Sequence, residues 1–239
     1  MIWRWLIFFN MAAGASLAAA ETPPTAVSGQ VELTNSREAA VRRHNDYAGV
    51  VLWLVPVERS TAMLSAGRRF EMKQWGKHFV PHVLAIPVGA TVDFPNLDPI
   101  FHNAFSNYSG QPFDVGLYPP GTSQSVTFRS AGIVRVFCHI HSTMSAIIAV
   151  LPTPWYALTP ESGRFTIADV PPGEYDLHIF HERALADNLK FLEHRIAVPA
   201  GGLRLPLISI SETGFLPAPH LDKYGQPYPQ NSGVYGGGK

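Results

Sequence analysis

The chain of 239 residues contains a single cysteine, Cys138. One cysteine cannot close a disulfide within its own chain, so a disulfide-stapled framework is excluded. The Cys138 thiol is therefore free, a metal ligand, or half of a bridge to another molecule. Its neighbours in the sequence distinguish these three cases.

Charge is also scarce. Charged residues make up 15% of the chain, and the formal net charge at pH 7 is 0. No run of lysines and arginines is longer than two residues, so the chain lacks the clustered basic face that a nucleic-acid-binding protein needs. We therefore expect no nucleic-acid partner.

Long amphipathic helices are missing as well, since no stretch of four helical turns shows a clear apolar stripe. Instead, 21 prolines and 20 glycines separate short apolar runs. This pattern is typical of strands joined by turns. It predicts an all-β protein.

The apolar run at the amino terminus is short. Arg4 precedes the apolar stretch from Trp5 to Phe9, and an alanine-rich segment ends at Ala20. This order predicts a secretory signal over residues 1–20. A membrane anchor would need roughly 20 apolar residues. We expect Sec-type export to the periplasm with no membrane span after cleavage, and an uncleaved anchor is the alternative.

Residues 66–153 predict a Greek-key β-sandwich, because short strands alternate there with proline and glycine turns. The expected strands are 79–86, 91–95, 103–107, 124–129, 132–138 and 144–151. Side chains two apart in a strand share a face, so Val134, Val136 and Cys138 lie together. Cys138 therefore points into the core.

A second small β-sandwich is expected from two separate stretches, residues 26–60 and 155–212. Its predicted strands are 27–33, 47–57, 164–170, 174–181, 193–198 and 203–210. The turn at Pro171-Pro172-Gly173 predicts a hairpin between the strands on either side of it. The later strands alone would leave edges bare, so the two early strands are expected to cover them and the middle block becomes an insertion. Residues 222–239 predict a flexible tail.

The segment after Cys138 carries further potential metal ligands. His141 follows three residues later, Met144 three beyond that, and His102 lies 36 residues upstream. In a continuing strand His141 would face away from Cys138, so we expect residues 139–143 to form a loop that turns it back. A thiolate, two imidazoles and a thioether are the donors that hold copper in electron-transfer sites.

Other interpretations compete with copper. A lone buried cysteine is most often a small apolar side chain. Zinc also accepts a cysteine and two histidines, but its structural sites need four firm ligands, and methionine is a poor fourth. His139 falls opposite Cys138 on the strand, so it is expected outside the ligand set. Two further pairs, His78 with His82 and His178 with His181, are weak signals for a second metal site. The remaining histidines, His44, His194 and His220, are expected to be exposed to solvent.

From about residue 77 to 152 the chain resembles the cupredoxins, the small blue-copper proteins that include plastocyanin, azurin and amicyanin. The Cys-x-x-His-x-x-Met spacing looks most like amicyanin. The chain is also similar to bacterial exported proteins of the methylamine-utilisation type, in which a carboxypeptidase-regulatory-like (transthyretin-like) domain follows. The matching stretches are Phe79-Val80-Pro81, Val88 to Val92, Phe94-Pro95-Asn96, Phe101 to Ser106, the Cys138 loop, and Gly163 to Tyr175.

The resemblance implies one mononuclear type 1 (blue) copper site. His102, Cys138 and His141 would be the strong ligands and Met144 the weak axial one. It also implies that Asn103 ties the His102 strand to the Cys138 loop by a hydrogen bond. His139 departs from the amicyanin pattern, which has a small residue at that position.

Three functions follow from these observations: a periplasmic carrier of single electrons, a module that stores, delivers or senses copper, and a multicopper enzyme. Oxidases place histidines on both sides of the cysteine, whereas Phe137 stands before Cys138 here, so no enzyme is expected. The buried position of Cys138 favours the electron carrier. We expect a monomer whose partners are redox proteins or, in the alternative, a copper-trafficking protein.

Overall fold

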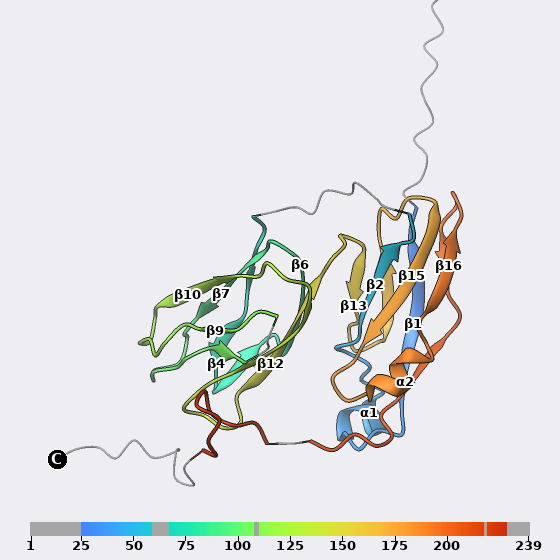
Figure 1. Cartoon of the computed structure of the whole chain (residues 1–239). Coiled ribbons are helices and arrows are strands. Elements are labelled where there is room, and N and C mark those ends of the chain that lie inside the picture. Colours follow the sequence, from blue (N-terminus) through green and yellow to red (C-terminus); the bar gives the residue numbers. More distant parts are fainter. Residues whose placement is uncertain (1–24, 59–66, 108–109, 218, 229–239) are drawn as a thin grey trace, which may run out of the picture.

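The computed structural model describes residues 25–58, 67–107, 110–217 and 219–228 (Figure 1). Among these residues strands dominate, and the helices are short: α1 (Ala39–His44) and α2 (Ala186–Lys190). The all-β prediction is confirmed at this level. No helix in the described part of the chain has the length and apolarity to cross a membrane. The predicted signal, residues 1–20, lies outside the described residues.

The middle of the chain forms a sandwich of strands, here called the central sandwich. One sheet has the strand order β6-β12-β11-β8-β9, a second has the order β10-β7-β3, and β4 pairs with β5. The strands are β3 (Arg69–Glu71), β4 (Lys73–Trp75), β5 (His78–Val80), β6 (Val83–Pro87), β7 (Thr91–Pro95), β8 (Phe105–Ser106), β9 (Phe113–Asp114), β10 (Ser123–Thr127), β11 (Gly132–Phe137) and β12 (Ser145–Leu151).

Alternation along these strands builds the core between the two larger sheets. Val92 and Phe94 of β7 are fully buried in the same cluster as Val134 and Val136 of β11. Successive side chains of a strand point to opposite faces, so these pairs mark the inner faces of the two sheets. Cys138 belongs to this cluster and is 0% exposed, as the parity of its strand predicted.

The stretches before and after the central sandwich together form a second sandwich. One sheet has the order β14-β1-β17 with β18 also on β1, and the other has the order β13-β2-β15-β16. The strands are β1 (Val27–Thr34), β2 (Val51–Pro56), β13 (Tyr156–Leu158), β14 (Arg164–Ile167), β15 (Gly173–Phe180), β16 (His194–Val198), β17 (Leu203–Arg204) and β18 (Ile208–Ser211). The carboxypeptidase-regulatory-like type of this sandwich stays a prediction.

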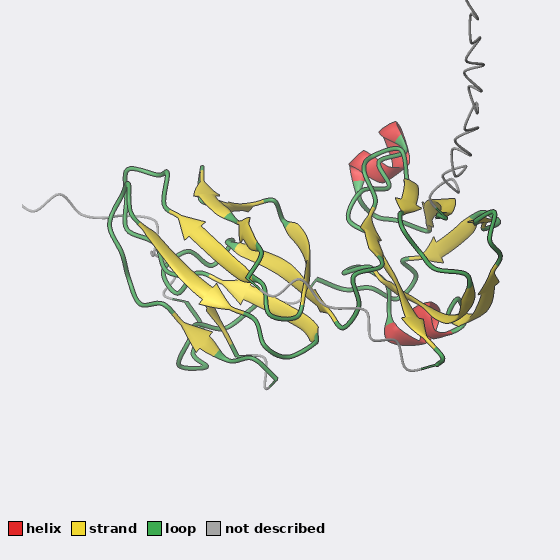
Figure 2. Ribbon diagram, turned by 90° about the horizontal axis from the view of Figure 1, so that it is seen from above, coloured by secondary structure: helices red, strands yellow, loops and turns green. Residues whose placement is uncertain are grey.

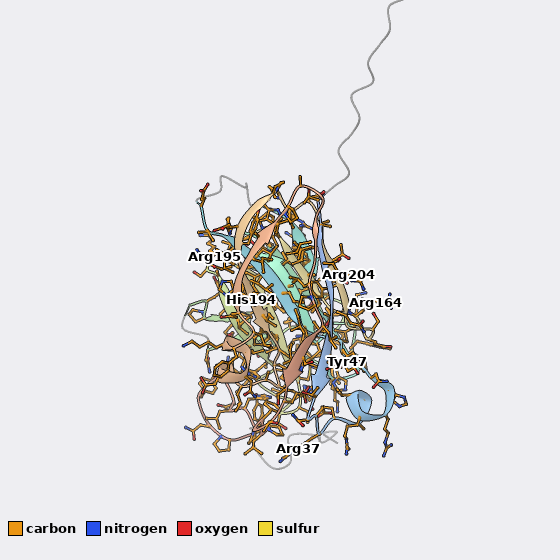
Figure 3. All side chains as sticks on the ribbon, turned by 90° about the vertical axis from the view of Figure 1, so that its right-hand side faces the viewer. Arg37, Tyr47, Arg164, His194, Arg195 and Arg204 are labelled. Atoms are coloured by element: carbon orange, nitrogen blue, oxygen red, sulfur yellow. The ribbon has the colours of Figure 1, made fainter. Side chains whose placement is uncertain are left out.

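The outer face of the second sandwich is polar. On β14 and β16, exposed residues such as Arg164 and Arg195 alternate with the buried Phe165 and Ile196. Figure 3 shows Arg164, Arg195 and Arg204 on the outside of the strands. The alternation explains why these segments could be recognised as strands with one buried face.

The predicted hairpin between residues 164–170 and 174–181 is wrong. β14 pairs with β1, whereas β15 pairs with β2 and β16, so the turn at Pro171 and Pro172 passes the chain from one sheet to the other. Alternation identified both strands correctly. Which strands they pair with depends on other segments of the folded chain. The local sequence does not contain this information.

The two sandwiches lie side by side and share an apolar contact (Figures 1 and 2). Val83 of β6 and Ile147 of β12 are buried with Val51 of β2 in one cluster. β12 is therefore buried on both faces, one toward the central core and the other toward the second sandwich. Next to this contact, the His82 ring of the central sandwich lies 2.8 Å from a carboxylate oxygen of Glu182 in the second.

Candidate metal centre

The connection between β7 and β8 holds His102. Its backbone N–H donates to the Tyr118 carbonyl at 3.3 Å, and the Tyr118 N–H donates to the His102 carbonyl at 2.9 Å. Because both backbone groups are paired, the residue has a fixed position without belonging to a long strand. The His102 side chain is 0% exposed.

Cys138 follows β11 directly, and a loop of six residues separates it from β12. The Cys138 N–H donates to the Met144 carbonyl at 3.2 Å, and the Met144 N–H donates to the His141 carbonyl at 3.0 Å. These two bonds close the loop and turn His141 back toward Cys138. The loop that the sequence predicted is confirmed.

The three strong ligand candidates meet at one point. The Cys138 Sγ lies 3.9 Å from the Nδ1 of His102 and 3.6 Å from the Nδ1 of His141. All three ligand atoms lie within 4.8 Å of one another. His141, at 9%, has the largest exposure of the three.

These separations fit a shared metal ion. In a trigonal arrangement, a metal–sulfur bond of about 2.3 Å and a metal–nitrogen bond of about 2.0 Å, the lengths found in zinc sites, put sulfur and nitrogen about 3.7 Å apart. The observed sulfur–nitrogen distances of 3.6 and 3.9 Å bracket this value. The side chains are thus already arranged for a metal.

Met144 completes the set at the exit of the loop. Its side chain is 0% exposed and belongs to the same core cluster as Cys138. A buried thioether beside a thiolate and two imidazoles is consistent with a type 1 copper site.

Asp98 fixes the orientation of the His102 ring, and sequence reasoning missed it. One carboxylate oxygen lies 2.7 Å from His102 Nε2, which leaves Nδ1 for the metal. The carboxylate also accepts the backbone N–H groups of Gly76 at 2.6 Å and Lys77 at 2.8 Å. Burial would raise the pKa of Asp98, but these N–H donors and His102 together hold it below its usual value. The sequence did offer a signal for this contact, because Asp98 is a carboxylate four residues before the ligand candidate His102.

Asn103 links the two ligand-bearing segments. Its side-chain oxygen accepts the backbone N–H of His139 at 3.1 Å, which is the connection that the cupredoxin resemblance implied. Its amide nitrogen donates to Asp114 at 2.6 Å. Asn103 itself is fully buried, whereas its partner Asp114 lies at the surface with 38% of its side chain exposed.

The environment prepares the ligands for a metal in different ways. Burial and the neighbouring His102 lower the pKa of His141 to about 4, so its imidazole is neutral at pH 7 and can offer a lone pair. Burial raises the pKa of the Cys138 thiol. Metal binding to this thiol must therefore release a proton.

The remaining histidines lie elsewhere. In the described part of the chain, His102, Cys138 and His141 are the one group of three histidine, cysteine or acidic side chains close enough to hold a metal. His139 lies outside this group, with its Nδ1 4.0 Å from Asp222. Three histidines of the two weaker pairs contact carboxylates: His82 contacts Glu182, His178 contacts Glu193 and His181 contacts Glu212, whereas His78 is exposed.

The expectation that His220 lies in solvent is wrong. Its ring stacks on Phe137 with centroids 4.2 Å apart and lies 3.2 Å from the Tyr228 hydroxyl. The segment around His220 has no regular spacing of apolar residues, so nothing in the sequence marked it as packed.

Comparisons with known proteins give partial likenesses. No family model and no curated protein matches the chain. A copper-containing nitrite reductase from Thermus scotoductus is 30% identical over 41% of this chain and 25% of its own, with a TM-score of 0.34. A purple cupredoxin from Nitrosopumilus maritimus is 23% identical over 35% of this chain and 99% of its own, with a TM-score of 0.31. A Cu(I) structure of an amicyanin mutant is 19% identical over 35% of this chain and 82% of its own, with a TM-score of 0.34.

Each of these proteins is similar to part of this chain. The match spans about a quarter of the reductase's length, and TM-scores below 0.5 carry no inference about what the chain binds or does. The chemistry of the centre therefore follows from its own side chains.

Proposed function

We propose that this chain is a type 1 copper protein that carries single electrons between redox proteins. The observation that supports this most is the buried convergence of Cys138, His102 and His141, with sulfur–nitrogen distances of 3.6 and 3.9 Å. Two soft sulfurs suit Cu(I), and imidazole accepts both oxidation states. Bound copper would supply the one-electron Cu(I)/Cu(II) couple.

The protein's own part is to keep the ligands still. Asp98 holds the ring of His102, Asn103 holds the backbone that follows Cys138, and the loop is closed by its own backbone bonds. Ligands held by such supporting contacts need little rearrangement when the charge on the site changes. Low rearrangement favours electron transfer over metal delivery, which needs exchangeable ligands.

Exposed apolar side chains on the segments that hold His102 offer a docking surface for a redox partner. Phe101, which precedes His102, is 46% exposed, and Leu117, which precedes the paired Tyr118, is 52% exposed. Trp75, whose neighbour Gly76 donates to Asp98, is 65% exposed. Neighbouring exposed apolar groups of this kind are typical of protein interaction sites.

We also propose that the protein acts in the periplasm as a monomer, after export directed by residues 1–20. The sequence order of charge, apolar run and small residues supports this. Cell fractionation tests it: the protein is expected in the periplasmic fraction with its amino terminus near residue 21. Retention in the cytoplasm would contradict export.

Voltammetry of the copper-loaded protein tests the carrier function. We expect a reversible one-electron wave that survives repeated cycling, together with slow loss of copper to an added chelator. Poor reversibility with rapid loss of copper would instead support the delivery function. A second sandwich that docks a partner protein would also suit that function.

A further inference from the structure

After the second sandwich, residues 219–228 return to the central sandwich. Residues 219–228, here called the strap, lie beside the Cys138 loop at the lower end of the central sandwich (dark red in Figure 1). The sequence predicted a tail without fixed contacts from residue 222 onward. In the described part of that tail, residues 222–228, several side chains are engaged instead.

One attachment is made to the cysteine ligand itself. The Tyr228 hydroxyl donates to the Cys138 carbonyl at 2.6 Å. His220, which lies 3.2 Å from the same hydroxyl, stacks on Phe137, the residue before the cysteine. The strap thus contacts the backbone of Cys138 and the side chain of Phe137, the last residue of β11.

A second attachment reaches the residues that support the ligands. The Lys223 ammonium lies 2.8 Å from one oxygen of Asp114, and the other oxygen accepts the Asn103 amide at 2.6 Å. Asn103 in turn accepts the His139 N–H. Through these bonds the strap is connected to both ligand-bearing segments.

The strap has its own internal order. The Asp222 carboxylate accepts the backbone N–H groups of Tyr224 at 2.9 Å and Gln226 at 2.8 Å, and the Asp222 N–H donates to the Gln226 carbonyl at 2.9 Å. Such side-chain-to-backbone bonds are typical of fixed turns. The Tyr224 ring packs edge-on against His139 at 5.2 Å.

We propose that the strap is a clamp on the Cys138 loop that limits access to the cysteine and slows loss of the metal. Tyr228 is its positioning residue, because it acts on Cys138 through the backbone carbonyl. To reach the thiol, a reagent or chelator must open the loop between Cys138 and Met144, and the strap bonds must break when that loop moves. The part concerning metal loss rests on the proposed copper function, whereas the part concerning access does not.

The access part can be tested on the full-length, metal-free protein, because Cys138 is its one thiol. The measurement is the rate at which a thiol reagent labels Cys138, relative to the rate in denaturant. Tyr228→Phe removes the hydroxyl that donates to the Cys138 carbonyl and contacts His220, and is expected to speed labelling about fivefold. Lys223→Met is expected to speed labelling about twofold, because its ion pair with Asp114 is partly exposed. The double variant is expected to show at least the product of these factors.

Tyr175→Phe is the matched control, because it removes a tyrosine hydroxyl that donates to a carbonyl, that of Pro171 at 2.8 Å, in the second sandwich. Tyr175→Phe is expected to leave the labelling rate of Cys138 unchanged. Tyr228→Phe is expected to keep the thermal unfolding midpoint of the whole chain within a few degrees of wild type. Labelling of all strap variants at the wild-type rate would overturn the proposal. So would an equal acceleration in Tyr175→Phe.

Transfer of Cu(I) to a chelator from the same full-length variants tests the metal part. Release is expected to accelerate by the same factors as labelling. If the wild-type chain forms no thiolate–copper band, the proposed function fails while the labelling result still decides on the strap. If the band forms and release rates are unchanged in the variants, the strap does not retain the metal and that part of the proposal is wrong.

Discussion

Asp98 shows how a single side chain can decide what a ligand does. A histidine offers two nitrogens, and the contact of Asp98 with the Nε2 of His102 at 2.7 Å leaves Nδ1 directed at Cys138. The carboxylate is itself fixed by backbone N–H donors from Gly76 and Lys77. The aspartate at position 98, four residues before His102, therefore sets the orientation of this ligand candidate.

Asp98→Asn is expected to weaken copper binding by about 10- to 100-fold, the usual cost of removing a carboxylate that supports a ligating histidine. A competition titration against a chelator of known affinity measures it. Asp176→Asn serves as the control, since Asp176 pairs with Arg195 on the second sandwich and is 44% exposed. Unchanged affinity in Asp98→Asn would show that the ring of His102 is held by other contacts.

The strands of this fold could be predicted from the sequence wherever the pattern of apolar residues marks a buried strand. The alternation in residues 132–137 marks β11, and its parity placed Cys138 in the core, whereas a continuous apolar run marks β12, which is buried on both faces. The turn of His141 back to the cysteine also followed, because three residues along a strand would have separated the two side chains. The ligand cluster was thus accessible from sequence.

Sheet partners and the strap could not be predicted in the same way. β14 and β15 are adjacent in sequence yet lie in different sheets, because β14 pairs edge to edge with β1 and β15 pairs with β2. The strap is fixed by hydroxyl, ammonium and carboxylate contacts of Tyr228, Lys223 and Asp222 rather than by apolar burial. Such contacts leave no periodic signal in a sequence.

At the scale of the element, the packing of β12 predicts a large cost for a small change. Ile148 is 0% exposed in the central core, so Ile148→Ala is expected to lower the free energy of unfolding by about 2–5 kcal/mol. Denaturant titration of the metal-free protein measures it. Leu117→Ala, at a position 52% exposed, should change stability by less than about 0.5 kcal/mol. A similar small effect for Ile148→Ala would place that side chain outside the core.

The whole molecule consists of two sandwiches joined by an apolar contact and by the pair of His82 and Glu182. The hydrogen bond that the His82 ring donates to the Glu182 carboxylate raises the pKa of His82 above its ordinary value of 6.5. Burial would raise the pKa of Glu182, but its contacts with His82 hold it below the ordinary 4.5. The pair therefore couples the junction between the sandwiches to pH.

The sign of this coupling follows from the two shifts. The contribution of His82 to stability is complete below pH 6.5 and is lost as the pH rises through its raised pKa. The contribution of Glu182 is complete above pH 4.5 and is lost as the pH falls through its lowered pKa. The pair is therefore fully stabilising between these values.

Glu182→Gln is expected to lower the free energy of unfolding by less than about 1 kcal/mol near pH 5.5, because the His82 ring is half exposed. The difference from wild type should shrink as the pH rises through the raised pKa of His82 and its ring loses its charge. Unfolding titrations across this pH range measure it. A difference that stays constant with pH would mean that the two side chains do not form an ion pair across the junction.

The most direct test of the central claim is the optical and EPR spectrum of the purified mature protein after addition of Cu(II). A thiolate from Cys138 with the imidazoles of His102 and His141 predicts an intense visible thiolate-to-copper band and a narrow parallel hyperfine splitting. Cys138→Ser is expected to abolish both. A colourless protein that binds Cu(II) through nitrogen and oxygen alone would contradict the account.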